Sequence, residues 1–255
     1  MTWFDAILLG IVEGATEFLP ISSTGHLILT NAALGNAVTE FSKSFDIVVQ
    51  LGAILAVVAL YWRSFLDVEK LKKIALAFIP TGIVGFALYP FAREYLLGDV
   101  FIVLVALVGG GIALIIFEYF HAKHPEEELV EKPMSSRDAL IIGLFQAIAI
   151  IPGVSRSAAT VIGGLALGYS RTSIVEFSFL LAVPTLLAAS GLDLVSEGFA
   201  FSNGEWILIL VGFVSSFVVA LASVRWLLSY VRWHSFTAFG VYRILLAVVF
   251  YLFFI

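Results

Sequence analysis

Cysteine is absent from the 255 residues, charged residues make up only 13%, and the net charge is −5. Average soluble domains carry about 25% charged residues, so this chain has too few to cover a water-soluble fold of its size. The lack of cysteine excludes a disulfide scaffold, and the acidic balance excludes a nucleic-acid binder. Apolar residues reach 61%, with a mean hydropathy of +1.05. This composition predicts an all-α polytopic membrane protein.

Long apolar stretches recur along the chain at the length that a bilayer requires. One crossing takes about 20 apolar residues, and a helix satisfies its own backbone hydrogen bonds in lipid. We therefore predict six transmembrane helices, at residues 45–62, 74–92, 100–120, 173–192, 205–224 and 236–255.

Two further apolar stretches are interrupted by polar residues and proline. Residues 3–30 contain Pro20 followed by hydroxyl side chains, and residues 138–168 contain Pro152 followed by hydroxyl side chains and an arginine. Neither makes a good continuous span, so we predict that each is a re-entrant helical hairpin.

The two interrupted stretches resemble each other. Ala6-Ile-Leu-Leu-Gly-Ile-Val-Glu13 matches Ala139-Leu-Ile-Ile-Gly-Leu-Phe-Gln146, and three full spans follow each stretch. We therefore predict a single membrane domain over residues 1–255, with repeat one at 1–125 and repeat two at 135–255.

Charge placement supports an inverted arrangement of these repeats. If each hairpin returns to the side it enters from, the spans of the two halves run in opposite directions and both termini face outside. Cytoplasmic loops then hold ten basic residues and external loops two, as the positive-inside rule requires. The ten are Arg63, Lys70, Lys72, Lys73, Lys123, Lys132, Arg137, Arg171, Arg225 and Arg232, and the two are Lys43 and Arg93. Inverted repeats place sites near the membrane midplane, between broken helices.

Glu13 and Glu17 are the first candidates for chemistry, because ionisable groups at membrane depth cost about 2.5–3.5 kcal/mol each to insert. They stand four residues apart, on one face of a helix predicted over 6–18. The pair could bind a hard divalent cation or transfer protons. The alternative is that one is protonated or that both reach water.

Ser22, Ser23 and Thr24 follow Pro20 and form a natural helix N-terminus, which attracts anions. His26 falls in the first turn of that helix and could act as an acid or base. A run of hydroxyl residues by itself is more often only a helix cap.

The second interrupted stretch also has hydroxyl residues at a predicted helix N-terminus, and it adds a fixed positive charge. Ser155, Arg156 and Ser157 open a helix predicted over 158–167, with Thr160 one turn further in. The planar guanidinium of Arg156 matches phosphate oxygens bidentately. The alternative is that Arg156 only pairs with Glu13 or Glu17 to hold the hairpins together. Arg243, in the last span, could pair with an acidic residue such as Glu118 or reach an interface.

Together these groups suit a polyanion with a leaving group, namely a phosphate or a pyrophosphate. If the repeats are inverted, two helix N-termini, an arginine, two carboxylates and a histidine meet at one place.

The two motifs resemble those of the bacterial undecaprenyl-diphosphate phosphatase family, of the bacitracin-resistance protein type. The first motif is Glu13-Gly-Ala-Thr-Glu-Phe-Leu-Pro-Ile-Ser-Ser-Thr-Gly-His26, and the second is Pro152-Gly-Val-Ser-Arg-Ser-Ala-Ala-Thr160. The resemblance extends over essentially the whole chain, including Phe177-Ser-Phe-Leu-Leu-Ala-Val-Pro184.

This resemblance implies an enzyme of the bacterial inner membrane that hydrolyses a polyprenyl diphosphate lipid to the monophosphate, with its site open to the extracytoplasmic side. It implies Mg²⁺ or Ca²⁺ as cofactor, held by Glu13 and Glu17. Catalytic roles are carried over to Glu13, Glu17, Ser23, His26 and Arg156. Substrate-binding roles are assigned to Ser22, Thr24, Ser155, Arg156, Ser157 and Thr160.

These residues are compatible with two mechanistic routes. Either Ser23 attacks with His26 as base, or His26 or a glutamate activates water directly. A lipid-phosphate transporter or flippase with the same layout is the rival function. The partners expected are the lipid substrate and membrane lipids, and a homodimer is one outcome for the oligomeric state.

Overall fold

The computed structural model describes residues 1–37, 39–96, 99–121, 132–197 and 203–255, and all regular structure within them is helical. The main helices are α1 (Trp3–Thr16), α2 (Ser23–Ala33), α3 (Glu40–Tyr61), α4 (Val68–Phe91), α5 (Val100–His121), α6 (Ser136–Ala147), α7 (Arg156–Ala166), α8 (Arg171–Glu197), α9 (Asn203–Val231) and α10 (Thr237–Phe254). Short helical turns follow three of them: η1 (Trp62–Leu66), η2 (Ala92–Leu96) and η4 (Ile148–Ile150).

Within the described residues, six helices are long and apolar enough to cross a membrane, namely α3 continued by η1, α4, α5, α8, α9 and α10. The chain is therefore a multi-pass membrane protein, as predicted. Several helices extend beyond the predicted spans because polar residues cap them outside the apolar stretch. Thr39 caps α3 before Glu40, and Asp67 caps α4 before a charged first turn. Lys123 and the predicted end of repeat one at 125 lie outside the described residues.

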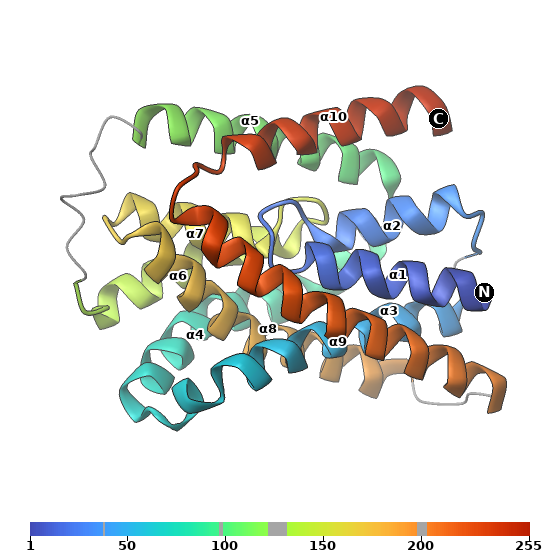
Figure 1. Cartoon of the computed structure of the whole chain (residues 1–255), viewed down its shortest axis with the longest axis horizontal. Helices are drawn as coiled ribbons and strands as arrows, with labels where there is room; N and C mark the ends of the chain where they lie inside the picture. The colour runs from blue at the N-terminus through green and yellow to red at the C-terminus, as the bar shows by residue number, and fades with distance from the viewer. Residues whose placement is uncertain (38, 97–98, 122–131, 198–202) are drawn as a thin grey trace.

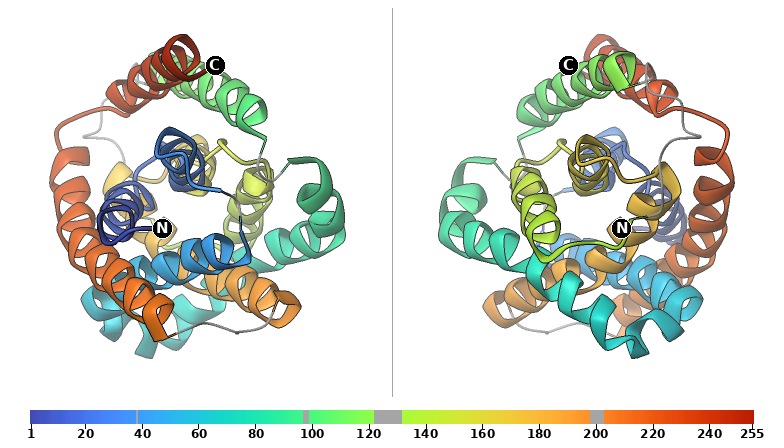
Figure 2. Two further views of the ribbon diagram at one scale, coloured as in Figure 1. Left: turned by 90° about the vertical axis from the view of Figure 1, so that its right-hand side faces the viewer. Right: turned by 90° about the vertical axis from the view of Figure 1, so that its left-hand side faces the viewer.

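The short helices form two helical hairpins that approach each other inside the molecule. Figure 1 shows α1 and α2 at the end where both termini lie, and α6 and α7 at the opposite end. The turn that joins α1 to α2 and the turn that joins α6 to α7 lie between these two ends. Figure 2 shows α2 and α7 near the middle of the molecule, with longer helices around them. The polar turns of both interrupted stretches are thereby placed in the interior.

Close backbone contact holds each hairpin against a long helix of the other half. Helix α1 packs along α9, and α6 packs along α4. A Cβ atom added at Gly10 of α1 would lie 2.4 Å from the carbonyl oxygen of Gly212, and one at Gly143 of α6 would lie 2.0 Å from that of Ala77. Gly10 and Gly143 are the matched glycines of the two sequence repeats, so the halves use equivalent positions for equivalent contacts.

The base of the second hairpin is closed by a hydrogen bond outside the spans. The hydroxyl of Tyr169, in the turn after α7, donates to Asp138 at the start of α6 over 2.7 Å. This bond lowers the pKa of the Asp138 carboxyl group, and burial raises the pKa of Tyr169 to about 12. Tyr169 therefore stays protonated and keeps donating at physiological pH.

Gly143→Ala is expected to lower the free energy of unfolding by about 1–3 kcal/mol, because a Cβ here forces α6 away from α4. Thermal unfolding of the detergent-solubilised protein measures this. Gly109→Ala is the matched control, since a Cβ there meets nothing within 4 Å. Equal melting temperatures for the two variants would contradict the close packing.

Candidate active site

Each hairpin turn ends at a serine whose backbone has a positive φ angle. Ser22 has φ 73° and Ser155 has φ 78°, and they are the only non-glycine residues with positive φ in the described part of the chain. Such conformations cost about 1–3 kcal/mol and concentrate at functional sites. Each hydroxyl accepts a hydrogen bond from the backbone N–H three residues on, at Gly25 and Ala158 respectively. The two helices that follow thus begin in the same way.

An ion pair joins the two turns. Arg156 Nη2 lies 3.1 Å from Glu17 Oε1, and the hydroxyl of Ser23 donates to the other carboxylate oxygen of Glu17. Both side chains of the ion pair are nearly buried, with exposed fractions of 10% for Arg156 and 3% for Glu17. Glu17 therefore links the hydroxyl of one helix N-terminus to the guanidinium of the other.

The remaining contacts of Arg156 fix its guanidinium. Nη1 donates to the carbonyl oxygen of Ser178 over 2.7 Å and to its hydroxyl at 3.3 Å. The hydroxyl of Thr160 lies 2.7 Å from that of Ser178. Nε of Arg156 is buried and has no hydrogen-bond acceptor among the described residues. An N–H donor thus stays available for an anion.

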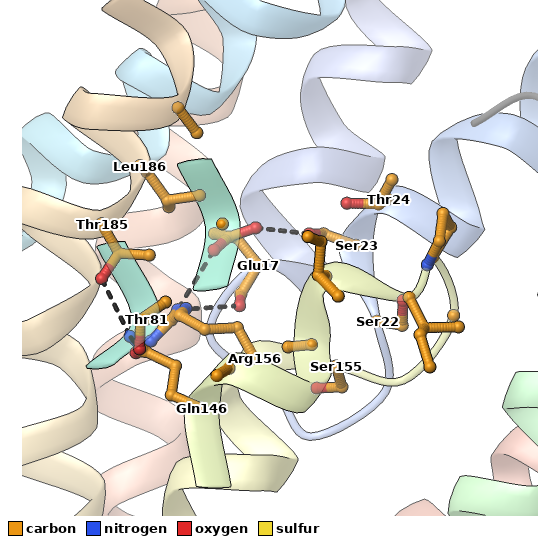
Figure 3. Close-up of a pocket in the computed structure, with 18 residues that line it drawn as sticks. Glu17, Ser22, Ser23, Thr24, Thr81, Gln146, Ser155, Arg156, Thr185 and Leu186 are labelled. Atoms are coloured by element: carbon orange, nitrogen blue, oxygen red, sulfur yellow. Dashed lines mark hydrogen bonds and ion pairs between the residues drawn. The ribbon is translucent and has the colours of Figure 1, made fainter. Parts of the chain in front are cut away.

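A cavity of about 210 Å³ lies beside this ion pair. It is smaller than the 300–1,000 Å³ pockets that enclose drug-sized ligands, so it suits a headgroup and not a long lipid chain. Figure 3 shows the hydroxyl residues of both turns on one side of it and an amide–hydroxyl cluster on the other. The polar lining residues include Glu17, Ser22, Ser23, Thr24, Thr81, Gln146, Ser155, Arg156 and Thr185.

Glu13, one helical turn before Glu17, is fully buried. Neither of its carboxylate oxygens has a hydrogen-bond partner among the described residues. It is within electrostatic range of Glu17, Asp46 and Arg156. Buried carboxylates are normally paired or coordinate a metal, so Glu13 and Glu17 fit a hard cation. The described residues contain no group of three or more histidine, cysteine, aspartate or glutamate ligands.

His26 is held by both ring nitrogens. Nδ1 lies 2.7 Å from the carbonyl oxygen of Ser22, and Nε2 lies 2.9 Å from the hydroxyl of Tyr242. Because a carbonyl only accepts, Nδ1 carries the proton and neutral His26 accepts from Tyr242. Ser23 donates to Glu17 and not to His26, so in this geometry the glutamate is its partner.

Arg243 is a site residue whose place the sequence left undecided. It is fully buried, and its guanidinium donates to carbonyl oxygens of both hairpin turns and of α5. These acceptors belong to Pro20, Ala106, Leu107, Gly153 and Val154, at 2.8–3.3 Å. Arg243 does not pair with Glu118, which instead binds Arg171 at 2.7 Å.

The structure thus brings most of the predicted residues together. Glu13, His26, Ser157 and Thr160 are not among the residues that line the cavity. The hydroxyl of Ser157 instead donates to the carbonyl oxygen of Phe18 and links the two turns. Sequence reasoning assigned no role to Ser178, Tyr242 or the cluster of Thr81, Gln146 and Thr185. Gln146 carried a signal, since it matches Glu13 in the repeat. The threonines and Tyr242 carried none, because isolated hydroxyl groups are common in membrane helices.

Comparison with known proteins finds one matching family model and several similar proteins. A family model described as "Bacitracin resistance protein BacA" matches residues 6–249. The chain is 49% identical to the undecaprenyl-diphosphatase of Aquifex aeolicus (strain VF5), over 100% of both chains. It is 48% identical to that of Sulfurihydrogenibium sp. (strain YO3AOP1), over 99% of both. Identity to that of Thermus thermophilus is 44%, over 99% of this chain and 97% of the relative.

Arg243→Met is expected to lower the free energy of unfolding by about 3 kcal/mol, because it leaves buried carbonyl oxygens of both turns without a donor. Chemical unfolding in detergent would measure the loss. Arg225→Met is the control, since Arg225 is an exposed arginine near the end of α9. A loss no larger than in the control would show that Arg243 does not hold the turns.

Proposed function

The chain belongs to the bacitracin resistance protein BacA family, and from this we propose that the central cavity is the active site of an undecaprenyl-diphosphatase. The enzyme hydrolyses undecaprenyl diphosphate to undecaprenyl phosphate and inorganic phosphate. This activity recycles the lipid carrier for peptidoglycan synthesis and gives bacitracin resistance. The observation that supports this assignment is the Ser23–Glu17–Arg156 chain of contacts at the cavity.

The two halves form an inverted-topology repeat with two re-entrant hairpins. The hairpins lie at opposite ends of the molecule, and their turns lie between them (Figure 1). Basic residues in η1, at the start of α8 and near the end of α9 support this orientation under the positive-inside rule, with these ends cytoplasmic and both termini extracytoplasmic. The cavity lining continues from Thr81 to Gly85 and from Thr185 to Ala189, toward the termini. The site therefore opens to the extracytoplasmic side.

Arg156 binds the diphosphate headgroup. Its free Nε and its Nη2 lie side by side, so a phosphate can accept two parallel hydrogen bonds if it displaces Glu17 from Nη2. The free N–H groups at the starts of α2 and α7 add positive potential. Binding of substrate then frees the carboxylate of Glu17 from its ion pair.

Ser23 is the nucleophile and Glu17 the group that takes its proton. Their hydrogen bond already exists, whereas both nitrogens of His26 are occupied. The oxygen of Ser23 bonds to the terminal phosphorus, and the bond to the lipid phosphate breaks with its electron pair on the leaving phosphate. Arg156 stabilises the charge that develops on the transferred phosphoryl group. His26 and Tyr242 hold the start of α2 in position.

Glu13 and Glu17 would hold Mg²⁺ or Ca²⁺, which when bound neutralises the leaving phosphate. The support for this is the pair of unpartnered oxygens on the buried Glu13 side chain. The polyprenyl tail lies in the surrounding lipid and against the apolar helix faces. A homodimer stays a prediction.

A transporter or flippase is not favoured. The relatives at 42–49% identity carry the name undecaprenyl-diphosphatase, and a passive anion carrier has no use for a serine hydroxyl bonded to a carboxylate. Purified protein in detergent, given lipid diphosphate and Mg²⁺, should release phosphate without any membrane gradient. Absence of phosphate release under these conditions would refute the enzyme assignment.

Arg156→Lys is expected to lower turnover at least tenfold, because lysine keeps the charge but loses the planar fork. The detergent assay measures this, with Arg225→Lys as the control at an exposed position. Near-normal turnover of Arg156→Lys would argue against bidentate binding.

Removal of divalent cations by a chelator is expected to abolish phosphate release, and added Mg²⁺ or Ca²⁺ should restore it. Glu13→Gln should raise the cation concentration needed for half-maximal activity at least tenfold, because one charged ligand is lost. Glu40→Gln, at an exposed carboxylate of α3, is the control. An unchanged cation requirement in Glu13→Gln would contradict its role as ligand.

A further inference from the structure

Gln146 lines the cavity opposite the serine and is almost fully buried, with 1% of its surface exposed. Its amide oxygen Oε1 has no hydrogen-bond partner among the described residues, although its amide nitrogen has two. A buried, unpartnered acceptor is costly and calls for a ligand. None of the roles assigned above uses this oxygen.

The neighbouring hydroxyls fix which way the amide points. Thr81 donates its hydroxyl proton to the carbonyl oxygen of Gly143 over 2.9 Å, and Thr185 donates its own to that of Leu181 over 2.8 Å. Each hydroxyl has one proton, so both can only accept from Gln146. Nε2 must therefore face them, at 2.8 and 3.1 Å, and Oε1 must point the other way.

The missing partner has to be an O–H or N–H donor. Arg156 Nε is a buried N–H donor of the same cavity lining, but it too has no partner among the described residues, so Nε and Oε1 are not bonded to each other. A terminal phosphate has a second pKa of about 6 and has lost its proton at pH 7. Water is the donor that remains, and an amide oxygen would repel bare phosphate oxygens.

The position of Gln146 suits an attacking water. Figure 3 shows Gln146 on one side of the Glu17–Arg156 pair and Ser23 on the other. Phosphoryl transfer requires the attacking and leaving oxygens to lie roughly in line, on opposite sides of phosphorus. Water bound to Oε1 would thus face a phosphoryl group carried by Ser23 from the side opposite the bond that breaks.

We propose that Gln146 is a catalytic residue that binds and orients the water which hydrolyses phospho-Ser23. The water oxygen bonds to phosphorus, and the bond from phosphorus to Ser23 Oγ breaks with its electron pair on Oγ. One water proton ends on Oγ, and the other leaves on hydrogen phosphate. Glutamine orients the attacking water of GTPases in the same way. The proposal rests on the proposed function, because it requires Ser23 to be the nucleophile.

The test separates the two products of the reaction. Undecaprenyl diphosphate labelled with ³²P in the terminal phosphate is mixed with detergent-solubilised enzyme and Mg²⁺, and both products are followed after rapid quenching. In Gln146→Leu, we expect one equivalent of lipid monophosphate per enzyme to form at the wild-type rate. Phosphate release should then be at least 20-fold slower, with label retained on Ser23.

Two further variants complete the design. Gln146→Glu keeps an oxygen acceptor and should slow phosphate release less than Gln146→Leu does. Leu144→Met, on the exposed side of the same helix, is the matched control and should leave both products unchanged. The initial burst in Gln146→Leu itself reports that the variant is folded and binds substrate.

An equal fall in both products in Gln146→Leu, or no fall at all, would overturn the proposal. So would a change in KM with the two products still formed together, since that would assign Oε1 to a protonated phosphate. Failure of the wild-type enzyme to release phosphate would instead refute the proposed function.

Discussion

The ion pair between Glu17 and Arg156 is the interaction on which the arrangement of the interior depends. It lies at 3.1 Å between two turns that are far apart in sequence. Neither charge could stay in this interior alone, because an isolated buried charge costs several kcal/mol. Each turn therefore needs the other, and the polar space between them is where a headgroup carrying several negative charges can compete for the guanidinium.

Arg243 stabilises this arrangement through hydrogen bonds to the backbone instead of an ion pair. Its positive charge is shared among backbone carbonyl oxygens of both turns and of α5, with no carboxylate partner among the described residues. Carbonyl oxygens cannot be removed by mutation, so the contact depends on the arginine alone. The strained backbone at Ser22 and Ser155 is held in place by such surrounding contacts.

Much of this could be predicted from the sequence, because the signals were local. The six spans follow from apolar length, and the interrupted stretches from Pro20, Pro152 and the buried charges between apolar residues. What could not be predicted depends on pairs distant in sequence. The orientation of Gln146 is set by threonines on α4 and α8. The position of Arg243 is set by carbonyl oxygens of the two hairpin turns and of α5. No local pattern encodes such contacts.

At two matched positions, the two halves of the chain carry side chains of different charge. Where the first half has Glu13, the second has the neutral Gln146, and where the first has Ser23, the second has Arg156. Two copies of the first half would bring four carboxylates to the centre, and two copies of the second would bring four guanidinium groups, from Arg156 and Arg243 of each copy. Neither combination could be neutral. The fusion of two halves in one chain therefore secures a one-to-one stoichiometry of unlike partners, which freely associating halves of equal fold would not guarantee.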